Sequence, residues 1–245
     1  TEKNLLKMKY YIIAGEASGD LHGSNLMKGI YAEDPQAEIR FWGGDLMHRV
    51  WTDSSKKPSQ GGLVRHYKEG AVMGFVEVLG KAGKLLKNVK FCKKDILAWN
   101  PDVVILIDYP GFNFKIAEFA HKAGFKVFYY IAPKVWASRE SRIKKLKAYV
   151  DKLFIVFPFE KAYFDSKGID YIYKGNPLVD AVDGSRAMLE SREDFLLRAG
   201  LEDRPIIAML AGSRKGEIGT MMPVLTEFAA KMKATARYSD YQFLI

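Results

Sequence analysis

The chain has 245 residues, of which 48% are hydrophobic and 27% are charged. This composition supports a sizeable buried core in one or two domains and excludes a chain that is disordered through its composition. The longest aliphatic run, residues 103–107, is far shorter than the ~20 apolar residues of a membrane-spanning helix, and no secretion-signal pattern occurs, so we expect a cytoplasmic protein.

The formal net charge of +9 favours an anionic partner, such as nucleic acid, a phosphorylated substrate or an acidic membrane surface. No helix-turn-helix, zinc finger or paired aromatic motif accompanies the basic stretch at residues 134–152, so we expect no nucleic acid. Cys92 is the only cysteine, which excludes an intramolecular disulfide and a zinc site built from cysteines.

Apolar runs bounded by glycine, proline or aspartate predict strands at residues 8–14, 39–42, 103–107, 127–131, 153–157, 171–173, 206–210 and 241–245. Between most of these runs the apolar residues recur at helical spacing, as do Leu85, Val89, Cys92 and Ile96. Strands that are apolar on both faces and alternate with helices indicate a parallel sheet wrapped by helices. The predicted fold class is therefore α/β.

The alternation of strands and helices breaks near Gly175-Asn176-Pro177, and a polar stretch follows. We place a domain boundary here, which gives a first domain at residues 8–180 and a second at residues 181–245. The second contains one full strand, a helix at about residues 220–237 and a strand on which the sequence stops. Since two strands cannot cover their apolar face, we expect this domain to be incomplete.

Two glycine turns share one skeleton: AGEASGD at residues 14–20 and AGSRKGE at residues 211–217. Each follows a predicted strand and opens a helix, yet neither matches the dinucleotide or P-loop pattern. The first is acidic and hydroxylic, with Glu16 and Ser18, and suits a sugar; the second is cationic, with Arg214, and suits a diphosphate. The alternative is that both are ordinary turns whose acids, Asp20 and Glu217, complement helix dipoles.

A further carboxylate, Asp108, directly follows the apolar run at residues 103–107. Partial burial at the end of a central strand would raise its pKa and make it a better proton acceptor for a hydroxyl group. Alternatively, Asp108 caps the next helix or turn. The sequence has no D-x-D motif and its four histidines lack metal-ligand spacing, so we expect no metal; His22, near the first turn, is interpreted as a solvated or core histidine.

The segment at residues 71–94 begins almost uncharged, with Met73 and Gly74, and ends rich in lysine. One hypothesis is that this segment holds acyl chains and meets acidic lipid headgroups. The other is that it forms a helix that covers the core and exposes its lysines to solvent.

Seven motifs occur in series: AGEASGD, AVMGFVEVL, PDVVILIDYPGFN, APKVWASRESRIKK, FPFEKAYFD, GNPLVD and LAGSRKGE. Together they resemble the lipid-A-disaccharide synthases, a family of inverting glycosyltransferases of the GT-B type, over residues 9 to 245. The resemblance implies two Rossmann-like domains, with acceptor and lipid surfaces in the first and the UDP-sugar in the second. This sequence differs from the family pattern at two positions. It has Asn176 where the family often has histidine, and Ser138 where the family typically has a second tryptophan.

The resemblance also implies a reaction and its partners. The reaction joins UDP-2,3-diacylglucosamine to 2,3-diacylglucosamine 1-phosphate without metal or cofactor, at the acidic inner-membrane surface of a Gram-negative bacterium, and members can form homodimers. Two alternatives stay open: a non-catalytic lipid-binding fragment of such an enzyme, and another UDP-sugar enzyme such as a 2-epimerase.

By position, the resemblance makes Asp108 the general base, places Glu16 in the same cleft, and makes Arg214 the diphosphate-binding arginine. The other substrate contacts that it implies are Gly15, Ser18, Gly19, Met73, Gly74, Asn113, Gly212 and Ser213.

Overall fold

The computed structural model describes residues 8–54, 61–70, 78–186, 190–213 and 215–245. The chain divides into two compact units between Gly184 and Ser185. The boundary that the sequence predicts, between residues 180 and 181, falls inside helix α8 (Pro177–Arg186).

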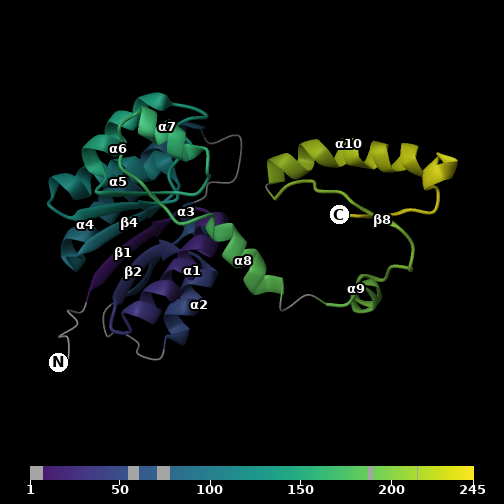
Figure 1. Cartoon of the computed structure of the whole chain (residues 1–245), viewed down its shortest axis with the longest axis horizontal. Coiled ribbons are helices and arrows are strands. Elements are labelled where there is room, and N and C mark those ends of the chain that lie inside the picture. The colour runs from purple at the N-terminus through teal and green to yellow at the C-terminus, as the bar shows by residue number, and fades with distance from the viewer. Residues whose placement is uncertain (1–7, 55–60, 71–77, 187–189, 214) are drawn as a thin grey trace. The chain divides into compact units, whose positions relative to one another are not determined.

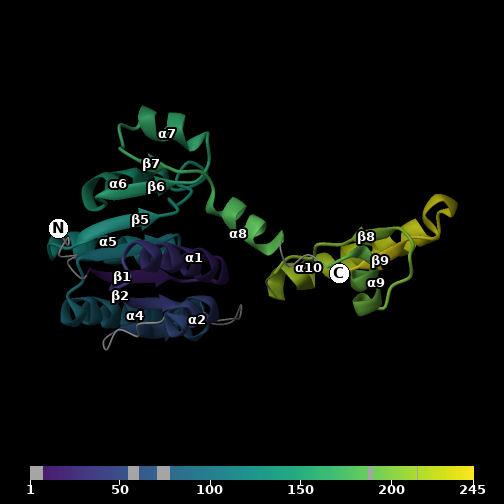
Figure 2. The same ribbon diagram turned by 60° about the horizontal axis from the view of Figure 1, so that its bottom comes forward.

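The first unit is built on a parallel sheet of seven strands in the order β3-β2-β1-β4-β5-β6-β7 (Figures 1 and 2). The strands are β1 Lys9–Ala14, β2 Glu38–Gly43, β3 Gly62–His66, β4 Val103–Ile107, β5 Lys126–Tyr130, β6 Lys152–Ile155 and β7 Ile172–Tyr173. The α/β prediction is confirmed. Strand β3 was not predicted: it pairs only with β2, and most of its residues are half-buried.

Helices pack on both faces of this sheet (Figure 2). The helices that contribute to the two cores are α1 Ala17–Glu33, α2 Asp45–Asp53, α4 Val78–Trp99, α5 Pro110–Lys122, α6 Ile143–Tyr149 and α7 Glu160–Ser166. The short helix α3 Tyr67–Gly70 follows β3, a 3-10 turn lies at Glu140–Arg142, and α8 extends beyond β7 with its apolar side chains exposed. Within the described residues, no helix has the length and apolar character needed to cross a membrane.

Side chains of the central strands alternate between two cores. Ile13 and Leu106 point into a core with α4, α5 and α6, whereas Ile12 and Ile105 point into a core with α1 and α2. Because both faces are covered, the central strands are apolar at nearly every position, which is the pattern that predicts them from sequence.

Strand β1 lies between β2 and β4, so the chain leaves it toward one side of the sheet and later returns on the other. Ala14 at the end of β1 pairs in register with Ile107 at the end of β4. In open α/β sheets ligands bind at such a reversal of strand order, beyond the carboxyl ends of the strands. The turns that follow Ala14 and Ile107 are therefore neighbours at this edge.

A polar network ties α4 to the sheet. The hydroxyl of Tyr11 donates to Asp95 (2.7 Å) and accepts from the indole N–H of Trp42 (2.9 Å), while Arg40 binds both carboxylate oxygens of Asp95. Burial is the largest cause that raises the pKa of Tyr11, and it also raises the pKa of the fully buried Cys92 thiol beside it. Such paired, buried polar groups fix one orientation of a helix.

The second unit contains a two-stranded parallel sheet. Its elements are α9 Arg192–Ala199, β8 Ile206–Ala208, α10 Lys215–Lys233, the 3-10 turn Ala236–Tyr238 and β9 Gln242–Leu244. Helix α10 begins directly in the second glycine turn, five residues before the start that the apolar spacing predicts.

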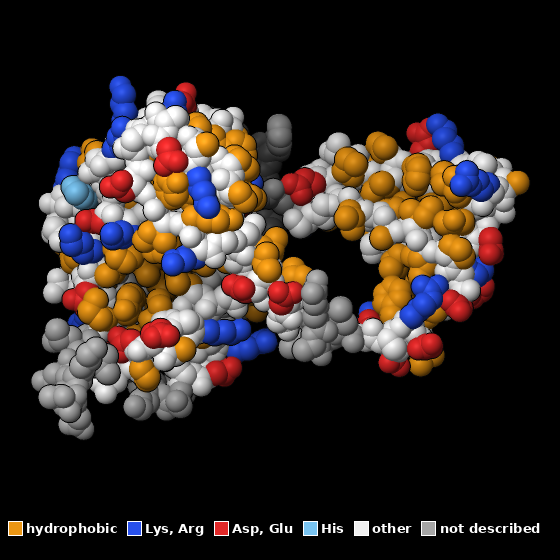
Figure 3. All heavy atoms as spheres, in the orientation of Figure 1, with side chains coloured by type: hydrophobic (Ala, Val, Ile, Leu, Met, Phe, Trp, Pro, Cys, Tyr) orange, Lys and Arg blue, Asp and Glu red, His pale blue; other side chains and the backbone are white. Residues whose placement is uncertain are grey.

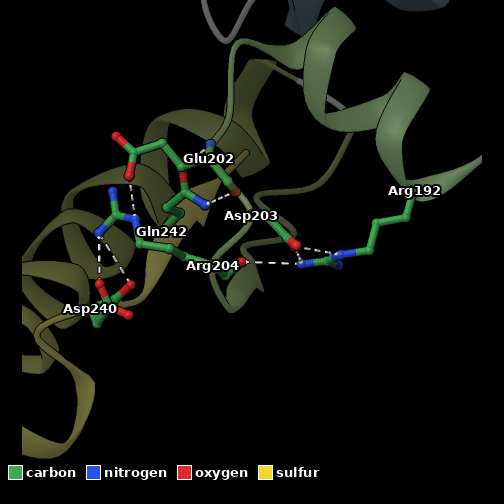
Figure 4. Close-up of polar contacts among 6 residues, drawn as sticks. All are labelled: Arg192, Glu202, Asp203, Arg204, Asp240 and Gln242. Atoms are coloured by element: carbon green, nitrogen blue, oxygen red, sulfur yellow. Dashed lines mark hydrogen bonds and ion pairs between the residues drawn. The ribbon is translucent and has the colours of Figure 1, made fainter.

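Polar contacts gather at the end of this small sheet where both strands begin (Figure 4). The guanidinium of Arg204 pairs with Glu202 (2.7 Å) on one side and with Asp240 (3.1 Å) on the other. The Gln242 side chain accepts from the Glu202 backbone N–H (2.9 Å) and donates to its carbonyl (2.7 Å). These contacts hold the start of β8 against the start of β9.

Helix α10 buries none of its described residues fully. Ile218, Met221, Val224 and Phe228 are exposed along it, and Figure 3 shows hydrophobic side chains gathered over this helix. The described part of the second unit thus has only a small core, consistent with the expectation of an incomplete domain.

Asp20, the last residue of AGEASGD, caps the neighbouring helix α2. It is only 3% exposed, and its carboxylate accepts hydrogen bonds from the backbone N–H groups of Gly44 (2.7 Å), Leu46 (3.0 Å) and Met47 (3.1 Å). A carboxylate at a helix N-terminus satisfies donors that have no partner within the helix. Asp20 therefore joins α1 to α2.

We expect Asp20→Ala to lower the free energy of unfolding by about 2–4 kcal/mol, because three backbone N–H groups, two of them in buried hydrogen bonds, lose a charged acceptor. Urea denaturation followed by circular dichroism measures this change. Asp45→Ala, which removes an exposed carboxylate from the same helix, is the control and should change the midpoint much less. Equal effects of the two substitutions would contradict the assignment of Asp20 as the cap.

Candidate functional site

The turns after β1 and β4 meet through a glycine. A Cβ atom on Gly15 would lie 2.3 Å from the ring of Tyr109, so only glycine permits this approach. Glu16 follows as the N-cap of α1, and Asp108 precedes the tyrosine on the other turn. Loss of hydration is the largest cause that raises the pKa of both Asp108 and Tyr109, and the negative charge of Glu16 raises both further. The two carboxylates that the sequence predicts for one cleft thus interact at this edge.

The turn at Asp108 has an unusual backbone. Asp108 (φ 40°) and Tyr109 (φ 46°) both lie in the left-handed region, although neither is glycine, and this conformation costs ~1 kcal/mol or more for each residue. The carbonyl of Asp108 accepts two hydrogen bonds of 2.7 Å, from the amide of Asn113 and from the hydroxyl of Tyr129. Both donors are fully buried. These contacts hold the strained turn in place.

The carboxyl group of Asp108 has a pKa above its usual range. Asp108 as a residue reaches solvent, but the surrounding protein removes part of the hydration of its carboxyl group, and this is the largest cause of the raised pKa. Glu16 raises the pKa further, whereas the positive charge of Lys134 lowers it. Asp108 is therefore a stronger base than an ordinary surface carboxylate.

Lys134 is a member of this site that sequence analysis missed. It lies in the loop after β5, and its ammonium group is 6.0 Å from the centre of the Phe157 ring. The available signal was its place in APK, directly after a predicted strand that ends at the same edge of the sheet.

Two residues that were expected to contact substrate are instead buried in the protein. Gly19 packs against β1, where an added Cβ would lie 3.2 Å from the Cβ of Ala14, and Asn113 is 0% exposed with its amide on backbone carbonyls. In this structure Gly19 and Asn113 support the turns of the site, and their contact with substrate stays a prediction. Ser18 is exposed in the first turn of α1. Met73 and Gly74 lie outside the described residues.

His22 is half-buried on α1, and burial lowers its pKa. This agrees with its interpretation as a core histidine. No cluster of three or more histidine, cysteine, aspartate or glutamate side chains suited to a metal ion occurs in the part of the chain that the structure describes.

In the second glycine turn, the carboxylate of Glu217 folds back onto the turn. Gly212 has a left-handed backbone (φ 93°), and a Cβ there would lie 2.8 Å from the carboxylate of Glu217. This carboxylate accepts a hydrogen bond from the backbone N–H of Ser213 (3.2 Å). Arg214 lies outside the described residues. The Ser213 N–H just before α10 thus has a carboxylate of that helix as its acceptor, and diphosphate binding at this turn stays a prediction.

Solved structures share this fold. A UDP-GlcNAc 2-epimerase from Neisseria meningitidis, bound to UDP-GlcNAc, aligns over 97% of this chain and 72% of its own with a TM-score of 0.64 and 12% identity. The UDP-GlcNAc 2-epimerase from Methanocaldococcus jannaschii, in complex with UDP-GlcNAc and UDP, aligns over 96% of this chain and 66% of its own with a TM-score of 0.61 and 14% identity. At such identities the likeness is one of fold.

Proteins similar in sequence identify the family of the chain, which the structural comparison does not. The lipid-A-disaccharide synthases of Geobacter metallireducens and Coxiella burnetii are 40% and 33% identical to the chain over 96% of its length. The chain spans 57% and 58% of the length of these two relatives. The family model described as lipid-A-disaccharide synthetase matches residues 10–245. The chain therefore belongs to the lipid-A-disaccharide synthetase family.

Proposed function

We propose that the chain acts in the transfer of a 2,3-diacylglucosamine unit from UDP to 2,3-diacylglucosamine 1-phosphate, which yields lipid A disaccharide 1-phosphate and UDP. The observation that supports this most is the raised pKa of Asp108 at the reversal of strand order between β1 and β4. Family membership supplies the reaction class.

In the proposed mechanism Asp108 is the general base. Its carboxylate takes the proton from the 6-hydroxyl of the acceptor while that oxygen attacks the anomeric carbon of the donor. The bond from this carbon to the diphosphate breaks, UDP leaves, and the configuration inverts. Glu16 raises the basicity of Asp108 and lines the acceptor side of the site with Gly15 and Ser18.

The second glycine turn is the proposed donor site. The residues Gly212, Ser213 and Arg214, together with the N-terminus of α10, would bind the diphosphate and offset the charge that grows on it as UDP leaves. In this role they replace the metal ion that other glycosyltransferases use. The diphosphate would displace Glu217 from the Ser213 N–H.

We further propose that the enzyme works at the acidic surface of the cytoplasmic membrane, which attracts a chain of net charge +9. In this proposal the segment that contains Met73 and Gly74 contributes one contact to the acyl chains, and the protein pairs as a homodimer. Sedimentation with acidic vesicles, measured together with UDP release, separates the transferase from a domain that only binds lipid.

We expect Asp108→Asn in the full-length enzyme to lower kcat by about 100-fold to 10,000-fold, because the amide cannot accept the proton. UDP release with both lipid substrates measures this rate. Asp45→Asn is the control, since Asp45 is an exposed carboxylate on α2. Turnover by Asp108→Asn equal to that of the control would remove Asp108 from the mechanism.

The pH dependence of kcat/KM tests the charges around Asp108. Glu16→Gln removes a charge that raises the pKa of Asp108, so the acidic limb of the profile should move to lower pH. Lys134→Gln removes a charge that lowers this pKa, so the limb should move to higher pH. Shifts in the same direction, or no shift in either variant, would show that another group titrates.

Tyr129→Phe tests the support of the strained turn. Loss of one of the two hydrogen bonds to the Asp108 carbonyl should lower kcat by about fivefold, the equivalent of ~1 kcal/mol, with little change in KM. Tyr130→Phe, in the other core of the same sheet, is the matched control. If both variants keep the wild-type kcat, the Tyr129 hydroxyl contributes only to stability.

A further inference from the structure

Three aromatic rings form a surface at the carboxyl edge of the first unit, which we call the aromatic ledge: Trp136, Phe157 and Phe159. Trp136 and Phe159 meet edge to face with ring centres 4.9 Å apart, and Phe157 stacks on Phe159 at 5.4 Å. Phe159 is 52% exposed and Trp136 is 38% exposed. Such large apolar side chains are exposed together far less often than singly, and a gathered set marks a binding surface.

A buried carboxylate holds the ledge in shape. Glu160 is 0% exposed; one of its oxygens accepts from the indole N–H of Trp136 (3.0 Å) and the other from the backbone N–H groups of Val156 and Phe157 (2.9 Å each). Burying a carboxylate is costly unless its partners are well placed. Here the three bonds connect the loop after β5 to the turn after β6, and they orient rings that face solvent. The ledge is therefore a preorganised surface.

The ledge is continuous with the candidate site through Lys134. The ammonium group of this residue lies 6.0 Å from the ring centre of Phe157, and its charge acts on Asp108. One surface thus presents exposed aromatic rings, a cation and the proposed base. Aromatic rings bury the apolar faces of sugars and acyl chains, and a lysine attracts phosphate.

We propose that the aromatic ledge binds the apolar part of the phosphorylated, acylated amino sugar whose hydroxyl Asp108 deprotonates. The proposal rests on the proposed function, because both take the same class of ligand. A molecule that has both acyl chains and a phosphate can pack its chains on the rings and place its phosphate near Lys134. A sugar phosphate without acyl chains leaves the rings of the ledge exposed to solvent.

The test is a calorimetric titration of the full-length enzyme with 2,3-diacylglucosamine 1-phosphate that carries six-carbon acyl chains, and with glucosamine 1-phosphate. Phe159→Ala should weaken binding of the acylated sugar about tenfold, since it removes most of a large apolar contact, and should leave binding of the other sugar unchanged. Phe159→Leu should lose less affinity. Leu97→Ala, which removes a side chain 54% exposed on α4, is the control and should bind as wild type.

The outcomes separate this proposal from the proposed function. If the wild-type enzyme binds the acylated sugar and Phe159→Ala binds it equally well, the ledge proposal is overturned while the proposed function stands. A lower unfolding temperature of Phe159→Ala with unchanged affinity also overturns it, because the ring would then serve only packing. If the wild-type enzyme binds no acylated sugar, both fail. If UDP prevents the acylated sugar from binding to the ledge, the ledge belongs to the donor site and the proposal is overturned.

Discussion

The parallel pairing of β1 with β4 determines where the candidate chemistry of this chain lies. Because Ala14 and Ile107 are partners in register, the two turns that follow leave the sheet side by side. The absence of a side chain at Gly15 then lets the ring of Tyr109 lie directly over the first turn. Without this pairing, Glu16 and Asp108 would not influence each other.

The electrostatics of the site result from a balance. Partial loss of hydration and the charge of Glu16 make Asp108 more basic, while Lys134 limits the effect. The backbone contributes separately, since two buried donors hold the Asp108 carbonyl while the carboxyl group stays accessible. A base that must accept a proton from a hydroxyl group needs both properties: a raised pKa and a fixed position.

The sequence predicts the central part of the fold because β1 and β4 are apolar on both faces and end in recognisable turns. Strand β3 escaped prediction because an edge strand with half-buried residues carries no continuous apolar pattern. A dipole role for Asp20 was one of two alternatives, and its hydrogen-bond partners at the start of α2 become visible only when α1 and α2 pack together. The role of Lys134 is likewise set by strand order, which residue spacing does not encode.

The environment of Cys92 gives this chain a practical property. Its thiol is fully buried beside Tyr11, and burial keeps it protonated by raising its pKa. Since the thiolate is the reactive form, this thiol should not react with maleimide reagents in the folded protein. A new cysteine placed on the exposed surface can therefore carry a single fluorescent or spin label, without prior removal of the native thiol.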